Sequence, residues 1–340
     1  MILYLTGDSE DLAPDLLFNG IVELLGQDEI IDFPYAEYRH KKVITGYGRN
    51  FFCTTVDKDA ENRNIYTFDD IKQLVNKEVF DLCIVANRAL NIFTQLVDSV
   101  TKFPKTVMVN GEDNSDSSLH IITNLSSKYW KYIDIVLQRD YRHNRKYDSK
   151  IIPYNFSCPV GILPKFHFKK DKDIDVFAQF PATHTFRRKV IERIKNIKDL
   201  KANVGYGGLS ILDYFKLMNN SKISISITGT GWDTPHYLEV PFMNSMLLAQ
   251  HPMNAMNSSM IEDPVVYINN FLDKYSAVFY NTDLSDLEEL IRYYLENDKE
   301  REQITKTGHE HLLNNLTTKK TAEYVFKCIE DKEYWKSHIL

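Results

Sequence analysis

The segment from Ser221 to Gln250 constrains the fold of this chain more than any other part of its sequence. It predicts an apolar strand at 223–227, a turn of small residues at 228–231, a helix whose first position is Pro235, and a second apolar strand after that helix. Thr234 is a favoured helix cap, and a proline at the first helical position loses no hydrogen bond. Free backbone N–H groups and the positive end of the helix dipole then face the ligand side of the strand, and this arrangement suits a phosphate.

Two polar side chains lie at the start of this helix. His236 and Glu239 are three residues apart, so both project from one face near the helix N-terminus. A carboxylate there can accept both hydroxyls of a ribose while the turn binds phosphate, and the pairing suggests a nucleotide. Short glycine motifs also match by chance, so an ordinary strand-turn-helix unit with polar surface residues is the alternative.

The rest of the chain alternates strands with helices, and its 340 residues are enough for two domains that each have a core. We predict an α/β fold of two Rossmann-like, doubly wound parallel-sheet domains. We expect domains at 1–160 and 161–320, and a C-terminal segment, 321–340, that packs back on the first domain. The predicted strands are 2–5, 29–33, 80–86, 105–109, 133–137, 173–180, 202–206, 223–227, 246–249, 265–268 and 277–280. The predicted helices, besides the one at Pro235, are 12–25, 68–75, 89–100, 186–197, 211–218, 284–295, 301–313 and 321–329. The stretch 43–56 fits a hairpin or an irregular insertion, and 151–172, punctuated by prolines, is the expected interdomain connection.

Composition excludes several classes of protein. The chain carries 41 Lys and Arg against 47 Asp and Glu, a net charge of −6, which gives no general attraction to nucleic acid or anionic membrane. No apolar run approaches the roughly eighteen residues of a membrane span. The N-terminus turns acidic by Asp8 and lacks the basic start of a signal peptide. The four cysteines are far apart, so neither a disulfide framework nor a zinc ribbon is indicated, and we expect a cytoplasmic protein.

Several catalytic motifs are missing from the sequence. Gly7 stands alone after the first predicted strand, where a dinucleotide-binding fold needs a glycine-rich fingerprint. The sequence has no P-loop and no Gly-x-Ser-x-Gly nucleophile elbow. His309 and His311 are two residues apart on a predicted helix and point to different faces, so no metal site is predicted.

Two charge clusters are placed to touch a ligand. Arg187 and Arg188 lie in the first turn of a predicted helix, where cations oppose the dipole unless an anion binds beside them, so we favour a phosphate role over a plain surface role. The acidic loop 110–116 follows a predicted strand, and ligands of parallel sheets bind outside the carboxyl ends of strands. A solvated turn is the alternative for this loop. The basic run 139–146 is read as a solvated face.

The order of these motifs resembles the two-domain GT-B glycosyltransferases, and in particular the group-1 branch with the CgeB-like, spore-maturation-type proteins. The resemblance spans most of residues 80–320. The matching segments are Asn110-Gly111-Glu112-Asp113, Ile174-Asp175-Val176-Phe177, Arg187-Arg188, Ser221-Lys222-Ile223, and Gly229-Thr230-Gly231-Trp232-Asp233-Thr234 with Tyr237-Leu238-Glu239.

The resemblance implies two domains that face a cleft and a second domain that binds a nucleotide sugar, with a UDP-sugar as the favoured donor. The sugar would pass to a hydroxyl acceptor without a metal ion or a separate cofactor. Glu239 would hold the ribose, and Arg187 would balance the phosphate charge that grows as the sugar leaves. His236 departs from the family pattern, because relatives typically carry an arginine there, although a protonated histidine could still donate to phosphate. The implied donor-binding residues are Arg187, Arg188, Gly229, Thr230, Gly231, Asp233, Thr234, His236 and Glu239.

The first domain is expected to bind the acceptor. If transfer inverts the anomeric centre, a carboxylate must take the acceptor proton. The candidates are Asp113 and Glu112, with Asp8 behind them. A retaining transfer needs no such base, and the sequence leaves this choice open.

The identity of the acceptor also stays open. A glycan, a lipid-linked sugar or a protein is the default, and a hydroxymethylated DNA base is an alternative, because some phage enzymes of this architecture modify DNA. The basic run 139–146 would favour DNA if it lined the cleft. A non-catalytic nucleotide- or glycan-binding module with a degenerate transferase fold is a further alternative, and a sugar-nucleotide epimerase ranks behind it.

Overall fold

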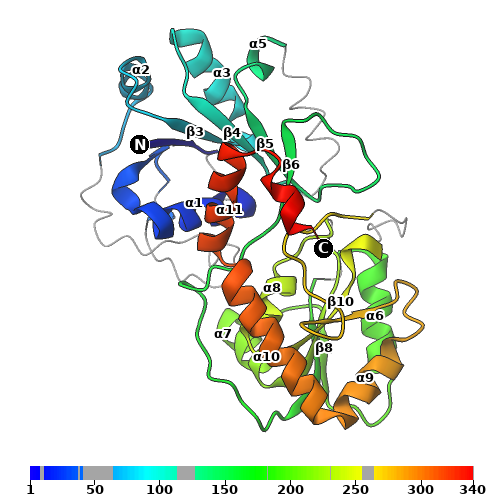
Figure 1. The fold of residues 1–340 in the computed structure, drawn as a ribbon. Helices are drawn as coiled ribbons and strands as arrows, with labels where there is room; N and C mark the ends of the chain where they lie inside the picture. The colour runs from blue at the N-terminus through cyan, green and yellow to red at the C-terminus, as the bar shows by residue number, and fades with distance from the viewer. Residues whose placement is uncertain are drawn as a thin grey trace. The chain divides into compact units, whose positions relative to one another are not determined.

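Figure 1 shows the fold in a computed structural model that describes residues 1–7, 11–36, 39–40, 64–112, 127–181, 183–229, 231–254 and 264–339. By its contacts the chain divides into two compact units, and each is described by itself. Unit 1 comprises residues 1–141, 146–162 and 318–338, and unit 2 comprises residues 142–145, 163–317 and 339–340. The stretch 43–56, predicted as a hairpin or insertion, lies outside the described residues.

Unit 1 is built on a six-stranded parallel sheet with the order β2-β1-β3-β4-β5-β6. Five of these strands confirm the sequence predictions with small shifts at their ends. The sixth, β6, forms in the stretch assigned to an interdomain connection, and it tolerates Pro153 because it is an edge strand. The strands are β1 (Ile2–Leu5), β2 (Ile30–Phe33), β3 (Leu82–Ala86), β4 (Lys105–Asn110), β5 (Ile135–Arg139) and β6 (Ile151–Tyr154).

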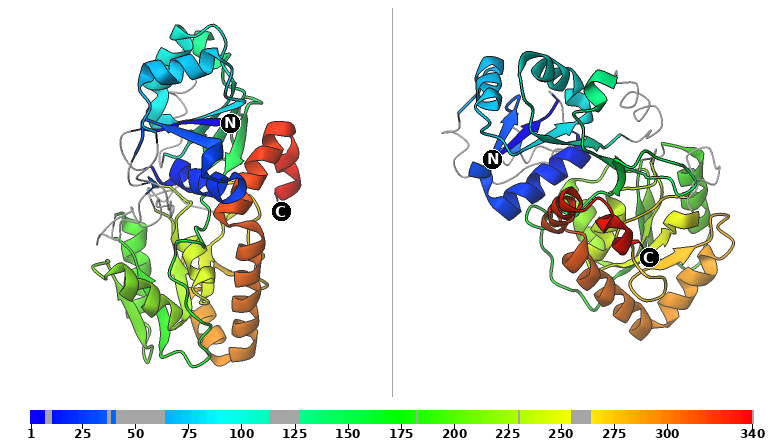
Figure 2. Two further views of the ribbon diagram at one scale, coloured as in Figure 1. Left: turned by 90° about the vertical axis from the view of Figure 1, so that its left-hand side faces the viewer. Right: turned by 45° about the horizontal axis from the view of Figure 1, so that its top comes forward.

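Helices cover both faces of this sheet, so its strands are apolar nearly throughout, as buried parallel strands require. Figure 2 shows α2 and α3 on one face and α1 with α11 on the other. A capping box between Thr67 and Asp70 fixes the start of α2. The helices of unit 1 are α1 (Leu12–Leu25), α2 (Phe68–Asn76), α3 (Leu90–Ser99), α5 (Ser127–Trp130) and α11 (Thr318–Glu330), with short 3₁₀ turns η1 (Gln27–Glu29), η5 (Asn87–Ala89) and η7 (Tyr334–His338).

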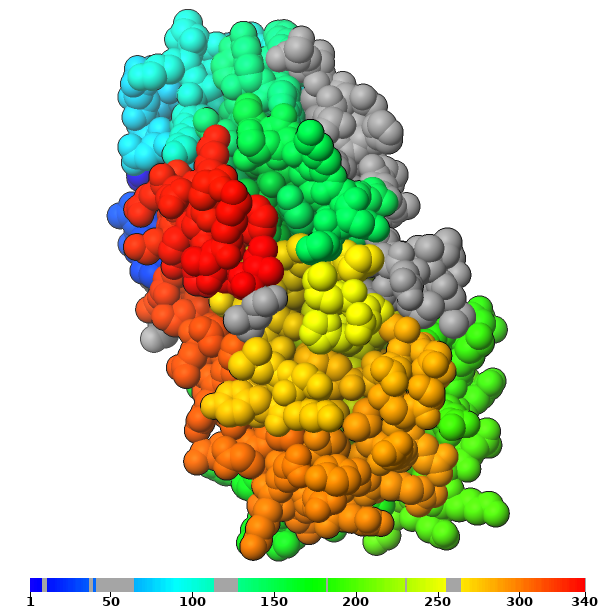
Figure 3. Space-filling view, turned by 45° about the vertical axis from the view of Figure 1, so that its right-hand side comes forward, coloured from blue at the N-terminus to red at the C-terminus, as the bar shows by residue number. Residues whose placement is uncertain are grey.

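Helix α11 lies against α1, although some 300 residues separate them in sequence. A Cβ atom on Gly20 of α1 would lie 2.0 Å from the carbonyl oxygen of Thr318, so only glycine permits this approach. Thr318 also donates its N–H to the Cys158 carbonyl at 3.1 Å. Figure 3 shows α11 and η7 in red beside the green segment near residue 141, where the rings of Tyr141 and Trp335 are 5.9 Å apart. Residues 318–338 are thus part of unit 1.

Unit 2 contains a five-stranded parallel sheet with the order β11-β10-β9-β7-β8. Its strands are β7 (Ile174–Gln179), β8 (Ala202–Gly205), β9 (Ser221–Ser226), β10 (Met246–Gln250) and β11 (Val278–Tyr280). Its helices are α6 (Thr185–Lys195), α7 (Ile211–Asn219), α8 (His236–Phe242), α9 (Leu287–Glu296) and α10 (Asp298–Asn315), with a 3₁₀ turn η6 (Pro252–Asn254). The two parallel sheets confirm the predicted α/β fold class.

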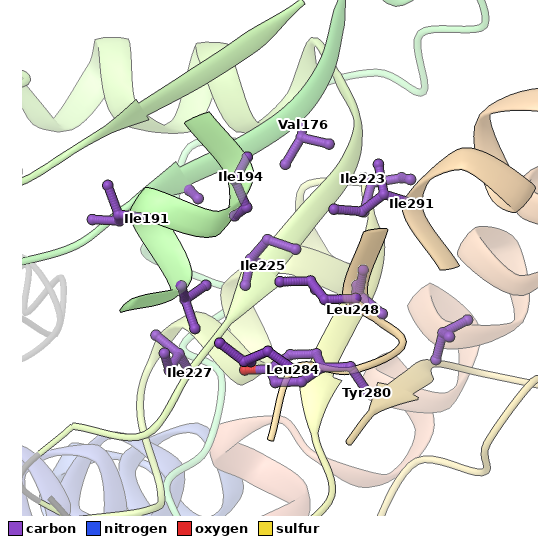
Figure 4. Close-up of a cluster of buried hydrophobic side chains, with 14 of the residues drawn as sticks. Val176, Ile191, Ile194, Ile223, Ile225, Ile227, Leu248, Tyr280, Leu284 and Ile291 are labelled. Atoms are coloured by element: carbon purple, nitrogen blue, oxygen red, sulfur yellow. The ribbon is translucent and has the colours of Figure 1, made fainter. Parts of the chain in front are cut away.

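The core of unit 2 joins this sheet to α6 and α9. Figure 4 shows Ile225 and Leu248 of the sheet packed between Ile191 of α6 and Ile291 of α9. All four side chains are at most 2% exposed. This cluster determines which face of the sheet α6 covers.

The predicted strand at 265–268 is wrong. Only Val265 pairs, in an isolated antiparallel bridge with Arg142. The side chain of Tyr267 packs instead against the rings of Trp232 and Tyr237, at 5.3 and 5.1 Å. Burial in an aromatic cluster explains the apolar run that suggested a strand.

In both sheets the strand order reverses at one point. In unit 1 the chain runs outward from β1 to β2 and then returns to β3 on the other side of β1. In unit 2 it runs from β7 to β8 and returns to β9 on the other side of β7. Ligands of open parallel sheets bind at the carboxyl ends of the strands at such a reversal. The topology therefore predicts ligand-binding sites at the loops after β1 and β3 and at those after β7 and β9.

The contact between α1 and α11 is testable at Gly20. We expect Gly20→Ala to lower the free energy of unfolding by about 1–3 kcal/mol, because the added methyl group forces the helices apart. Urea denaturation measures the loss. Gly161→Ala is the matched control, because its Cβ would meet only the end of the Glu23 side chain at 3.3 Å. Equal stability of the two variants would contradict the close helix approach.

Candidate functional site

The turn after β9 is held by its own backbone. The N–H of Gly229 donates to the carbonyl of Gly231 at 2.8 Å, and the Thr228 hydroxyl donates to the same carbonyl at 3.1 Å. A Cβ on Gly229 would lie 3.2 Å from Nη2 of Arg187 and 3.3 Å from Cγ2 of Thr234. A side chain at position 229 would therefore press on both Arg187 and Thr234.

An arginine and a histidine that follow β7 both contact the carbonyl oxygen of Thr228. Nε of Arg187 donates to the Thr228 carbonyl at 2.9 Å, and Nε2 of His184 lies 2.9 Å from it. Nη1 of Arg187 also donates to the Pro181 carbonyl at 3.2 Å. The guanidinium stacks over the Phe180 ring at 5.5 Å. Arg187 is 5% exposed, so its charge is held in place beside the glycine turn.

Helix α8 begins one residue later than the sequence predicts. Pro235 is the cap residue, with φ −54° and ψ −34°, and His236 is the first helical residue. The side chain of the cap makes no capping hydrogen bond because proline has none to offer. Since α8 has only seven residues, its dipole contributes less to the site than the side chains around it.

Glu239 is more buried than a surface ribose ligand would need to be. It is 4% exposed, and the hydroxyl of Tyr214 donates to its Oε2 at 2.9 Å. Among the described residues, Tyr214 is the one hydrogen-bond donor to this carboxyl group. Burial raises the pKa of Glu239 to about 7, partly offset by the bond from Tyr214. The carboxyl group is therefore poised to change protonation near neutral pH.

His236 lies near Glu239 but is uncharged at neutral pH. Burial and the neighbouring Arg187 lower the pKa of His236 to about 3, against a hydrogen bond with the Gln179 backbone that raises it. The rings of Tyr214 and Phe180 lie 6.0 and 6.2 Å from it. The protonated form considered from sequence is thus not the one present near pH 7.

The remaining predicted donor residues divide into three groups. Asp233 and Thr234 are buried in the turn, at 2% and 6% exposure, and Gly231 closes it. Arg188 is exposed on α6, away from these contacts. Thr230 lies outside the described residues. The structure thus groups Arg187, Gly229, Gly231, Asp233, Thr234, His236 and Glu239, and leaves Arg188 apart.

Charged side chains also meet at the strand reversal of unit 1. Nε of Arg88, after β3, lies 3.2 Å from Oε1 of Glu112, after β4, and 3.6 Å from Oδ2 of Asp11, after β1. Gly7 and Gly111 allow this grouping. A Cβ on Gly7 would lie 2.8 Å from Cβ of Arg88, and one on Gly111 would lie 3.1 Å from Oδ1 of Asp11. Of the predicted carboxylates only Glu112 is described; Asp8 and Asp113 lie outside the described residues.

Sequence reasoning missed Asp11. It is 8% exposed, and its Oδ2 accepts no hydrogen bond from the described residues. Burial raises the pKa of Asp11 to about 6, with Arg88 opposing the rise. Its place between the first predicted strand and the first predicted helix was the available signal, because this is the loop that the strand reversal selects.

The basic run 139–146 does not form a continuous exposed surface. Arg139 is 2% exposed and stacks over the Phe156 ring at 4.4 Å. Arg142 is 7% exposed and pairs with Val265. Only His143 to Lys146 are exposed, so the prediction of a solvated face holds for the second half of the run.

The described residues contain neither a metal-binding cluster nor a helix suited to span a membrane. No group of three or more His, Cys, Asp or Glu side chains there is arranged to hold a metal ion. None of the helices described has both the length and the apolar character that crossing a bilayer demands.

Part of the sequence matches a known protein family, and solved structures match nearly the whole chain. Residues 187–327 match the family described as Glycosyl transferase-like. The solved structure of HepE from Anabaena in complex with UDP is similar, with a TM-score of 0.62, 10% identity, and coverage of 97% of this chain and 99% of that one. A search of curated proteins finds no match.

Two further solved structures match nearly the whole chain. An alpha-glucosyltransferase in complex with UDP-glucose and DNA containing an abasic site has a TM-score of 0.57 at 9% identity, covering 97% of this chain and 98% of that one. A glycosyltransferase from Rickettsia africae has a TM-score of 0.55 at 10% identity, covering 98% of each. At such identities these likenesses show the fold, which is GT-B.

The buried carboxyl group of Glu239 predicts a pH-dependent stability. Its pKa is about 7 in the folded protein and near 4.5 when unperturbed, so between these values the folded protein holds a proton that the unfolded chain has released. The free energy of unfolding should therefore fall as pH rises from about 4.5 to about 7. Glu239→Gln should not show this fall. Its free energy of unfolding relative to the wild type should therefore increase by up to about 3 kcal/mol as pH rises through this range.

Chemical denaturation at pH 5 and pH 8 measures this difference. Glu296→Gln, at an exposed position of α9, is the matched control and should follow the wild type at both pH values. A Glu239→Gln advantage that is the same at both pH values would contradict the raised pKa.

Proposed function

We propose that this chain is a glycosyltransferase whose donor is a UDP-sugar. Its GT-B fold and the match of residues 187–327 to the Glycosyl transferase-like family support the proposal. The observation that carries the proposal is the grouping of Glu239, Arg187 and the Gly229 turn at the strand reversal of unit 2. A fixed cation, a glycine turn and a nearly buried carboxyl group are the chemistry that a nucleoside diphosphate needs.

Glu239 would bind the ribose through its carboxylate. An ionised carboxylate can accept both ribose hydroxyls, whereas the protonated acid offers fewer acceptor sites. Hydrogen bonding to the charged form lowers a pKa, so donor binding would release the proton that burial retains near pH 7. The Tyr214 hydroxyl would share Oε2 with the ligand.

Arg187 would serve the diphosphate. Its guanidinium is fixed by two backbone carbonyls, so little reorganisation is needed when negative charge grows on the leaving diphosphate. Gly229 keeps the turn close to that guanidinium. His236 would contribute only a neutral ring.

The acceptor would bind at unit 1, where the chemistry required is removal of a hydroxyl proton. For an inverting transfer we propose Asp11 as the base, with Arg88 keeping it partly ionised. Glu112, Asp113 and Asp8 stay as the alternatives drawn from sequence, and Glu112 is already paired with Arg88. A retaining transfer would need none of them.

The acceptor class is proposed to be a sugar, lipid-linked sugar or protein hydroxyl. The DNA in one of the similar structures belongs to that protein alone. In this chain Arg139 and Arg142 are buried and the net charge is −6, so the electrostatic attraction that dominates DNA affinity is weak.

Donor binding is tested by calorimetry with UDP and UDP-glucose. We expect Glu239→Gln to weaken UDP binding by roughly 10- to 100-fold, because hydrogen bonds to a charged group contribute about 1.5–3 kcal/mol. Wild-type affinity should rise between pH 6 and pH 8 as the carboxyl group ionises, and the variant should show no such rise. Glu296→Gln is the control and should bind as the wild type does. A nucleotide at 100 times its dissociation constant should add about 2.7 kcal/mol to the free energy of unfolding and so raise the melting temperature. If no nucleotide raises the melting temperature, the proposal fails.

The base is tested by turnover of a UDP-sugar with water as acceptor. We expect Asp11→Asn to lower kcat by roughly 10²- to 10⁴-fold while UDP affinity is unchanged. In the wild type the rate should rise with pH to a plateau above about 6, following the pKa of Asp11. The exposed Asp28→Asn is the matched control. Full activity of Asp11→Asn would rule out this base, and binding without any turnover would favour a non-catalytic nucleotide-binding module.

A further inference from the structure

Gln250 has a buried side-chain amide. It is the last residue of β10 and is 1% exposed. Neither its Nε2 nor its Oε1 forms a hydrogen bond within the part of the chain that the structure describes. A buried polar group left unsatisfied costs roughly 1–3 kcal/mol, so an amide with both ends unpaired calls for a ligand.

The strand register places Gln250 beside the proposed donor site. Ala249 of β10 is the partner of Ser226, the last residue of β9, so Gln250 lies one residue past this last pair, at the end of β9 from which the glycine turn follows. Side chains two apart on a strand share a face, and Leu248 faces the core that lies under α6. The Gln250 amide is therefore on the α6 side of the sheet, the side that carries Arg187.

His184 presents a second unpaired atom on this side. Its Nε2 lies 2.9 Å from the Thr228 carbonyl, which can only accept, so Nε2 carries the proton. Nδ1 has no hydrogen-bond partner among the described residues, and the side chain is 9% exposed. Burial lowers the pKa of His184, and the charge of Arg187 adds to this, against hydrogen bonds with the Thr228 and Gly229 backbones that raise it. The ring is therefore neutral, and with the proton on Nε2 the Nδ1 atom is an acceptor.

The chemistry of these atoms selects the ligand group. A phosphate oxygen carries no proton at neutral pH, so it cannot donate to Nδ1 of His184. A hydroxyl group can donate to Nδ1 or to Oε1 of Gln250 and accept from Nε2 of Gln250. Arg187, by contrast, offers only donors and suits the diphosphate.

We propose that His184 and Gln250 form a subsite that binds hydroxyl groups of the transferred sugar and selects which hexose the protein accepts. The inference rests on the proposed nucleotide-sugar function and adds that this subsite contacts the sugar part of the donor. A site built to pair hydroxyl groups rejects an analogue that leaves its buried polar atoms unpaired.

The test compares Gln250→Leu and His184→Gln with the wild type. The first replaces the amide with an apolar group of similar size. The second keeps a donor near the Nε2 position for the Thr228 carbonyl and removes the Nδ1 acceptor. Gln303→Leu, at an exposed position of α10, is the matched control for the glutamine substitution.

Calorimetry measures binding of UDP, UDP-glucose, UDP-galactose and UDP-N-acetylglucosamine. We expect both variants to bind UDP within about twofold of the wild type but to bind the preferred UDP-sugar at least about tenfold more weakly. Without ligand, Gln250→Leu should melt roughly 2–4 °C higher than the wild type, because a buried unpaired amide is gone. Gln303→Leu should change neither quantity.

The outcomes separate this inference from the function on which it rests. If the wild type binds neither UDP nor any UDP-sugar, the proposed function fails and the subsite fails with it. If UDP binds but both variants keep the wild-type preference among the sugars, only the subsite is overturned. A lower melting temperature of Gln250→Leu with unchanged sugar binding would show that the amide is structural and would also overturn the subsite. If Gln250→Leu does not fold, His184→Gln decides by the same criteria.

Discussion

The Thr228 carbonyl oxygen organises the site of unit 2. It receives Nε of Arg187 and Nε2 of His184, each at 2.9 Å, and so ties the loop and helix after β7 to the turn after β9. These two strands flank the point where the strand order reverses. Both side chains are therefore anchored to the same point of the turn. The first bond fixes the position of the Arg187 guanidinium, and the second fixes the tautomer of His184.

Much of the fold could be predicted from the sequence. The strands β7 and β9 and the glycine turn that follows β9 are short apolar runs followed by breakers, and such local patterns give element type directly. The apolar stretch 265–268 shows the limit of this reasoning. Its Tyr267 packs against the rings of Trp232 and Tyr237, which lie outside the stretch, so apolar character alone did not make a strand.

The site could be predicted only in part, because burial and strand register are not local properties. The sequence indicated Glu239 and Arg187 by their places on helices, yet the pKa of Glu239 depends on burial and on Tyr214, which lies 25 residues earlier. Gln250 offers no pattern of its own and becomes notable only through its position beside β9. Asp11 likewise stands out only after the sheet order places the ends of β1 and β3 together.

The two strand reversals carry complementary chemistry on similar frameworks. In unit 2 the helix after the first strand presents Arg187, a cation fixed by backbone carbonyls, which suits a phosphate that gains charge. In unit 1 the residue that precedes the corresponding helix is Asp11, a carboxylate whose ionisation lies near neutral pH, which suits a hydroxyl that loses a proton. Sugar transfer by inversion needs both functions, one for the leaving group and one for the nucleophile. A chain that merely bound a nucleotide would need only the first, so Asp11, whose Oδ2 lies 3.6 Å from Nε of Arg88, is the side chain at which the proposed transferase and a nucleotide sensor would differ.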